Sequence, residues 1–238
     1  MAKSTFPHYQ ARSGWNALLP PRSARTTRPE ESHFGAIVIG AGVTGLAAAR
    51  RIAELEPDTR VLVLDASVIG EGSSGRNSGF LINLPHNTGM SGHGSATDVA
   101  RKQIRLYNQG LTWLKGLVDT HGIQCGWSEV GKYHAAATAD GERRLHAALK
   151  DYPARDVACR ELDHDALQAD LGTRYYRYGY HSDSNVFVQP AAFVRGLADN
   201  LPANVWLWEN EPVISLGRSR PFKVGTRSAQ LTADRVVI

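Results

Sequence analysis

Residues 36–49 read AIVIGAGVTGLAAA, an apolar run that enters a Gly-x-Gly-x-x-Gly turn and continues as a stretch of small residues. The run predicts a buried strand, and the stretch after the turn predicts a helix. In such a turn the first glycine allows the tight bend, the second lets the backbone approach a pyrophosphate, and the third lets the helix lie close to the sheet. The N-terminus of the helix offers free N–H groups and a positive dipole end to the phosphates. The candidate phosphate-binding residues are Gly40, Gly42, Val43, Thr44 and Gly45.

A second apolar run, residues 61–64, leads directly into Asp65, twenty positions after Gly45. A carboxylate at this place binds the adenosine ribose hydroxyls in a dinucleotide-binding unit. It argues against NADP, whose additional phosphate prefers an arginine. The alternative is a glycine turn in an ordinary α/β protein, and the ordered strand, helix, strand and acid disfavour it.

Residues 70–80, GEGSSGRNSGF, hold four glycines within ten positions. So many permissive residues predict a backbone that passes close to a ligand, with polar side chains supplying contacts. A flexible loop is the alternative for this segment taken alone. The segment also separates a flavin protein from a nicotinamide one. Its candidate cofactor contacts are Ser73, Ser74, Gly75, Arg76 and Asn77.

These motifs, in this order, resemble the FAD-dependent amine oxidoreductases related to D-amino-acid oxidase, glycine oxidase and sarcosine oxidase, and most of all the γ-glutamylputrescine oxidoreductase branch. The resemblance follows the order of elements over about residues 8–238 and is specific in 35–82. It implies a glutathione-reductase-like FAD-binding Rossmann domain with an inserted antiparallel-sheet substrate domain, an α/β fold that is α+β overall. It also implies FAD as cofactor and oxidation of an amine or amino-acid C–N bond to an imine by hydride transfer to flavin.

The resemblance adds two cofactor contacts: Ala66, beside the ribose acid, and Val213, whose backbone would meet the adenine. The chain departs from the family in having Asp65 where glutamate is usual, a shorter side chain with the same two acceptors. It also stops at Ile238 inside an expected strand, so we expect a C-terminally truncated member whose catalytic group lies beyond that residue. A naturally short protein whose last strand closes a sheet is the alternative. No catalytic base is assigned.

Composition is that of an ordinary globular protein, with 42% hydrophobic and 21% charged residues. The net charge is +4, of which residues 1–33 contribute +3, and this basic segment is expected to be a solvated tail. It predicts no nucleic-acid partner. Cys125 and Cys159 are isolated and imply neither a metal site nor a disulfide framework, which favours a reducing, cytoplasmic location. No apolar run is long enough to span a membrane, and the N-terminus lacks a secretory signal; a mitochondrial leader is the alternative.

The chain divides into four predicted regions: a polar N-terminal lead, 1–33; a FAD-binding βαβ part, 34–82; part of a substrate domain, 83–185; and a return to the FAD-binding domain, 186–238. In the third region Thr97 and Asp98 would cap a helix that ends at Gly122. Its predicted inward face is Ile104, Tyr107, Leu111, Leu114 and Val118. Further strands are predicted at 123–127, 132–137, 174–181, 204–208, 213–216 and 231–238, and helices at 141–150 and after Pro190.

His86 and His93 lie in a glycine-punctuated loop where they could face a flavin or a substrate, although loop histidines are more often solvated. His181 and Asp183 are too few for a metal site. The predicted partner is a small amine or amino acid. Two other functions stay open: a non-catalytic or degenerate FAD-binding fragment, and an NAD-dependent dehydrogenase that uses the same turn.

Overall fold

A computed structural model of the 238-residue chain describes residues 9–84, 96–150, 152–183 and 185–238. The chain forms two compact units. The first comprises the residues up to Gly79, Leu117–Cys125 and Gln189–Ile238, and the second comprises Phe80–Gly116 and Gly126–Val188. Among the described helices, none is both long and apolar enough to cross a bilayer.

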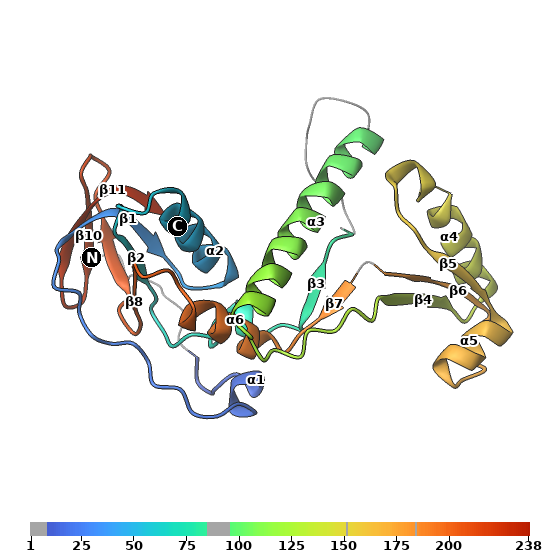
Figure 1. The fold of residues 1–238 in the computed structure, drawn as a ribbon. Coiled ribbons are helices and arrows are strands. Elements are labelled where there is room, and N and C mark those ends of the chain that lie inside the picture. Colours follow the sequence, from blue (N-terminus) through green and yellow to red (C-terminus); the bar gives the residue numbers. More distant parts are fainter. Residues whose placement is uncertain (1–8, 85–95, 151, 184) are drawn as a thin grey trace. The chain divides into compact units, whose positions relative to one another are not determined.

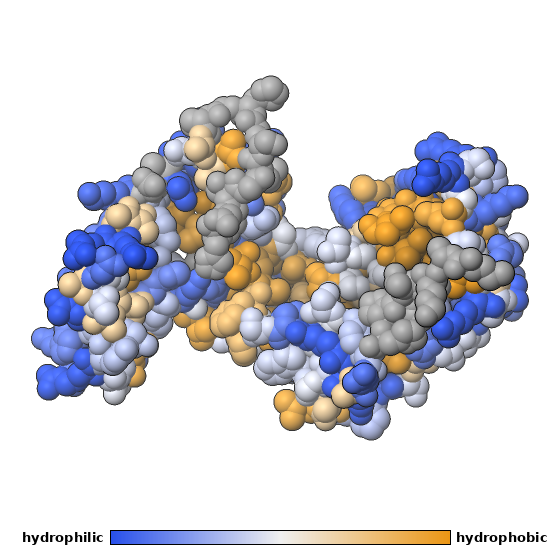
Figure 2. Space-filling model, turned by 180° about the vertical axis from the view of Figure 1, so that it is seen from behind, coloured by the Kyte–Doolittle hydropathy of each residue, from blue (hydrophilic) through white to orange (hydrophobic). Residues whose placement is uncertain are grey.

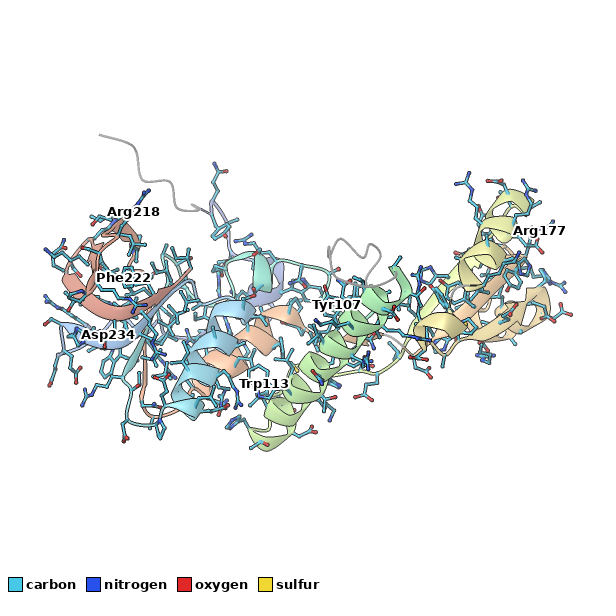
Figure 3. The ribbon with its side chains drawn as sticks, turned by 90° about the horizontal axis from the view of Figure 1, so that it is seen from above. Tyr107, Trp113, Arg177, Arg218, Phe222 and Asp234 are labelled. Carbon is cyan, nitrogen blue, oxygen red and sulfur yellow. The ribbon has the colours of Figure 1, made fainter. Side chains whose placement is uncertain are left out.

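The first unit contains a six-stranded sheet in the order β8-β2-β1-β11-β10-β9 (Figure 1). The four strands from β8 to β11 run parallel, and β10 is antiparallel to both of its neighbours. Figure 3 shows Phe222 and Asp234 on the adjacent strands β10 and β11. The strands are β1 (His33–Ile39), β2 (Val61–Leu64), β8 (Val205–Trp208), β9 (Val213–Leu216), β10 (Phe222–Thr226) and β11 (Gln230–Val237).

The centre of this sheet is apolar on both faces, as expected of parallel strands covered by helices. All four residues of β2 are buried, and Ile37 and Leu62 pack in one cluster with Leu231 from β11. The helices of this unit are the short α1 (Gly14–Ala17), α2 (Val43–Leu55) and α6 (Pro190–Asp199). Helix α2 packs against β1 and β2, so the turn between β1 and α2 lies at the carboxyl edge of the parallel strands.

The N-terminal segment, residues 9–32, is not the solvated tail that its composition predicts. Ser13 and Asn16 are buried, and the indole nitrogen of Trp208 donates a hydrogen bond to the carbonyl of Thr26 at 3.1 Å. The backbone N–H of Glu209 donates to the carbonyl of Arg25 at 2.7 Å. Because these contacts use backbone and polar groups, the segment has no apolar periodicity to reveal that it packs on the rest of the first unit.

The second unit contains a three-stranded antiparallel sheet in the order β4-β6-β5, with α4 and α5 packed against its strands. Tyr178 and Tyr180 of β6 form a small core with Leu149 of α4. A two-stranded antiparallel pair, β3-β7, and the long α3 up to Gly116 also belong to this unit, whereas the end of α3 from Leu117 belongs to the first unit. The elements are β3 (Phe80–Ile82), α3 (Ala96–Thr120), β4 (Lys132–Ala136), α4 (Ala139–Leu149), β5 (Arg160–Asp163), α5 (His164–Leu171), β6 (Tyr178–Ser182) and β7 (Asn185–Phe187).

The mixed α/β class, the inserted antiparallel sheet and most predicted elements are confirmed. The strand predicted at 123–127 is wrong, because Gly126 has φ +61° and the chain turns there. The strand predicted at 174–181 begins only at Tyr178. Tyr107, assigned to the inward face of α3, is 40% exposed, and Figure 3 shows it with Trp113 on that helix. His86 and His93 lie outside the described residues.

The face shown in Figure 2 carries several separate hydrophobic patches among hydrophilic residues. More than half of the accessible surface of a folded protein is ordinarily apolar, so exposed apolar side chains alone mark no site. Among the large ones that are exposed are Leu106 on α3 and Ile214 and Leu216 on β9.

Candidate dinucleotide-binding site

The glycine turn has the geometry that its sequence predicts. Gly40 has φ +103°, a conformation that side chains other than glycine rarely adopt. A Cβ added to Gly45 would lie 1.9 Å from the carbonyl oxygen of Gly40, so the first turn of α2 is packed against the preceding loop. Helix α2 begins at Val43, after Gly42 in extended conformation. The tight bend and the close helix packing are therefore confirmed.

The second glycine-rich segment lies against this turn. Residues Ser73–Gly75 form a short 3-10 helix, and the hydroxyl of Ser74 accepts a hydrogen bond from the backbone N–H of Val43 at 3.1 Å. A Cβ on Gly42 would lie 2.8 Å from the same hydroxyl. Two motifs that are about thirty residues apart thus meet at the N-terminus of α2.

A cavity of about 390 Å³ opens between these segments. Its wall also includes the end of β2 and the turn before β9. Eight of the thirteen candidate cofactor contacts line it: Gly40, Gly42, Asp65, Ala66, Ser73, Ser74, Gly75 and Val213. Val43, Thr44 and Gly45, in the first turn of α2, are not part of the wall, and neither are Arg76 and Asn77.

Asp65 lies at the end of β2, inside this cavity. Its Oδ2 accepts a hydrogen bond from the backbone N–H of Ala41 at 2.7 Å, and its Oδ1 accepts one from Ser67 at 2.8 Å. Burial raises the pKa of Asp65, while these two N–H groups oppose the rise and the Glu209 carboxylate adds to it. Each carboxylate oxygen has a second lone pair, so Asp65 can also accept from a ribose hydroxyl.

Arg76 and Asn77 support the loop that carries Ser74. The guanidinium of Arg76 lies 2.9 Å from Glu71 and stacks over the Tyr9 ring, 4.4 Å from its centroid. The amide nitrogen of Asn77 donates to the carbonyls of Ser73 and Ser74, at 3.1 and 2.8 Å. The structure therefore places both side chains among protein groups, and a direct role of either in cofactor binding stays a prediction.

Sequence reasoning missed two residues that shape the cavity. Glu209 is 1% exposed and accepts hydrogen bonds from the Arg22 guanidinium at 2.8 Å and from the backbone N–H of Ile69 at 2.7 Å. It fixes the segment after Asp65, of which Ile69 lines the cavity. The sequence offered one sign of Glu209: a charged residue that directly follows the apolar strand β8. Tyr9 also lines the cavity, and no motif marks it.

These features fit a bound dinucleotide. Gly42, which has no Cβ and lines the cavity, is the N-cap of α2, where N–H groups and the helix dipole favour a pyrophosphate. The partly buried carboxylate of Asp65 lies beside this turn at the end of the next parallel strand, and a second carboxylate, Glu211, also lines the cavity. The fold and the cavity define a dinucleotide-binding protein of the Rossmann type.

Residues 36–238 match the model of the DAO family, described as FAD dependent oxidoreductase. The chain therefore belongs to the DAO family of FAD-dependent oxidoreductases, and its cofactor is FAD. This confirms the family expected from the glycine-rich motifs and disfavours a nicotinamide dehydrogenase.

The chain is 27% identical over 205 residues to gamma-glutamylputrescine oxidoreductase of Escherichia coli, covering 84% of this chain and 47% of that protein. It is 25% identical over 238 residues to the probable oxidoreductase OrdL of Rhizobium meliloti, covering 95% and 53%. The crystal structure of glycine oxidase from Geobacillus kaustophilus matches with a TM-score of 0.73 at 16% identity, over 87% of this chain and 55% of that one. The chain spans about half the length of the curated relatives it matches.

Proposed function

We propose that this protein takes part in oxidising the C–N bond of an amine or an amino acid, with FAD bound in the cavity at the N-terminus of α2. The observation that carries the proposal is this cavity, in which the glycine turn, Asp65 and Ser74 come together in a chain of the DAO family. The names of gamma-glutamylputrescine oxidoreductase and glycine oxidase support the substrate class.

The chain's own residues would bind and orient the cofactor. The N-terminus of α2 and the bare backbone of Gly42 would hold the pyrophosphate, Asp65 the ribose hydroxyls, and the backbone of Val213 the adenine edge. The Ser74 hydroxyl, which accepts a hydrogen bond from the Val43 N–H, would bind the same phosphate as that N–H. When bound, FAD supplies the acceptor for the two electrons that leave the substrate.

The test begins with the visible spectrum of the purified chain before and after adding FAD, with bound flavin separated by gel filtration. Oxidised flavin absorbs near about 375 and 450 nm, so retained bands measure occupancy. We expect FAD to be retained. A colourless chain that takes up no FAD would contradict the assignment of the cavity.

The substrate class is tested on the flavin-loaded chain without oxygen. γ-Glutamylputrescine, putrescine, glycine and sarcosine are added singly, beside an α-hydroxy acid and a glycerol phosphate as non-amine controls. We expect an amine to bleach the band near about 450 nm and the controls to leave it unchanged. If only a control compound reduced the flavin, the bond that the protein oxidises would be a C–O bond and not a C–N bond. Bound FAD that no compound reduces would favour a non-catalytic FAD-binding module.

A further inference from the structure

A second cavity, of about 620 Å³, lies in the first unit beside the N-terminal segment. Residues 9–12 and 21–22 form one side, the segment after Asp65 forms another, and Arg195 of α6 contributes to the wall. Three of its lining side chains are arginines, Arg12, Arg22 and Arg195, against one carboxylate, Glu71. Neither Arg12 nor Arg195 lines the cavity assigned to FAD.

Arg22 is already neutralised by protein groups. Its guanidinium lies 2.8 Å from the buried Glu209 and 3.0 Å from Asp199. Because two carboxylates already pair with Arg22, its positive charge needs no further anion from the cavity. The two other arginines therefore decide what the cavity can bind.

Glu71 cannot satisfy both of them. One of its oxygens lies 4.0 Å from Nε of Arg12, while the other accepts from Arg76 at 2.9 Å and from the backbone N–H of Ser13 at 2.6 Å. Apart from this long contact, the one hydrogen bond that Arg12 makes within residues 9–84, 96–150, 152–183 and 185–238 is to the carbonyl of Asn16 at 3.5 Å. Its side chain is 59% exposed, and a guanidinium carries further N–H donors that could turn toward a ligand.

Arg195 is a buried cation in the wall of this cavity. It is 9% exposed, and its Nη1 donates a hydrogen bond to the carbonyl of Pro20 at 2.8 Å. Within the described ranges no carboxylate lies at ion-pair distance from it, and its buried Nε has no partner. Burial lowers the pKa of Arg195, the charges of Arg22 and Arg12 lower it further, and the weaker effects of the Asp199 and Glu71 carboxylates oppose this shift. A buried charge of this kind is costly unless an opposite charge meets it.

We propose that this cavity binds a small oxyanion, with a carboxylate or a phosphate group, against the guanidinium groups of Arg195 and Arg12. A guanidinium presents parallel N–H groups that match the oxygens of either anion. The bound anion neutralises the buried charge that the protein itself leaves unpaired. The cavity shares Tyr9, Ala66, Ser67 and Val68 with the wall of the cavity assigned to FAD, but its arginines do not line that cavity.

The experiment measures binding of inorganic phosphate and of glutarate to the 238-residue chain by titration calorimetry, with ionic strength held constant by sodium chloride. We expect at least one of the two to bind the wild type, and the pair to show which source of oxyanion the site prefers. Arg195→Gln should weaken that binding about tenfold or more, through loss of a charge-assisted contact. Arg143→Gln removes an equal charge from an exposed arginine paired with Asp140, and should leave it unchanged.

Thermal unfolding distinguishes a loss of anion binding from a loss of folding. The bound anion should raise the Tm of the wild type and not that of Arg195→Gln. Without anion, the variant should unfold at the same or a higher temperature, because it loses an unpaired buried charge. Arg12→Gln, at an exposed side chain, offers a second variant with intact folding and should weaken binding too.

Two results would overturn the proposal. In one, neither phosphate nor glutarate binds the wild type at constant ionic strength. In the other, Arg195→Gln and Arg12→Gln both bind the anion that the wild type binds, and as tightly, which would place it elsewhere, such as at the N-terminus of α2.

Discussion

The hydroxyl oxygen of Ser74 accepts a hydrogen bond from the backbone N–H of Val43, across 3.1 Å. This N–H is among the first of α2, which have no carbonyl partner inside the helix and are available to a phosphate. Ser74 therefore satisfies a group that the cofactor's pyrophosphate would use. Its hydroxyl can turn to donate to the same phosphate, so the two glycine-rich segments would bind FAD together.

Replacing Ser74 with alanine should weaken FAD binding about tenfold while leaving the fold intact, because one charge-assisted hydrogen bond is lost. The measurement is a titration of FAD, followed by its fluorescence or by gel filtration. Ser215→Ala, at an exposed position of β9, is the matched control and should bind FAD as the wild type does. An unchanged dissociation constant for the Ser74 variant would show that its hydroxyl serves only the loop.

Gly42 and Gly45 should fail in different ways when each is changed to alanine. Among the described residues, apart from its chain neighbours, a Cβ on Gly42 would meet the side chain of Ser74, which can shift, so this variant should fold and lose FAD affinity. A Cβ on Gly45 would overlap the Gly40 carbonyl at 1.9 Å, so that variant should lose stability first. Circular dichroism melts and flavin content separate the two effects. Gly116→Ala, with open space around it in α3, is the control for both.

If a folded Gly42→Ala variant held as much flavin as the wild type, the pyrophosphate would not bind at this turn. A Gly45→Ala variant as stable as the wild type would contradict the close packing of α2 against the loop that ends β1.

The sequence predicted the unit from β1 to Asp65 because each of its signals is local. The apolar strands, the three glycines and the acid occur within thirty residues, and their spacing alone places Asp65 beside the turn. The strand at 123–127 failed for the opposite reason. Its apolar composition suits a strand, but the φ of +61° at Gly126 bends the chain out of a ladder.

The role of the N-terminal segment was beyond sequence reasoning because its partners are far away along the chain. Arg22 pairs with Glu209, 187 positions later, and the carbonyl of Arg25 accepts from the backbone of the same glutamate. Such polar, long-range contacts leave neither periodicity nor a motif. The same limit hid Arg195, whose surroundings come from three separate parts of the chain.

The Arg22 and Glu209 pair should be strongly coupled. Arg22→Met would leave the Glu209 carboxylate buried opposite no cation, a change that typically costs about 3–5 kcal/mol. In Arg22→Met with Glu209→Gln, the buried charge is gone and much of the loss should be recovered. Urea unfolding of the wild type, both single variants and the double variant gives the coupling free energy.

The control for this cycle is Arg177→Met with Glu142→Gln, an exposed pair in the second unit. Its coupling should be about 1 kcal/mol or less, as is usual for exposed ion pairs. Additive effects at Arg22 and Glu209 would mean that water reaches the carboxylate despite its burial.

The contact between Glu56 and Arg235 should make stability depend on pH in the acid range. Glu56 follows the last turn of α2, and Arg235 of β11 donates to it at 2.7 Å, as does the Thr59 hydroxyl at 2.9 Å. The Arg235 hydrogen bonds, with help from Thr59, lower the pKa of Glu56 from 4.5 to about 2. The unfolded chain then binds a proton more readily than the folded one, so this contribution is complete above about pH 4.5 and is lost as the pH falls toward 2.

The free energy of unfolding of Glu56→Gln should therefore fall less steeply than that of the wild type across this window, and the two should converge near its acid end. Arg235→Gln should remove the same pH dependence, and adding it to Glu56→Gln should change the slope no further. Parallel slopes for the wild type and Glu56→Gln would mean that the contact does not persist in solution.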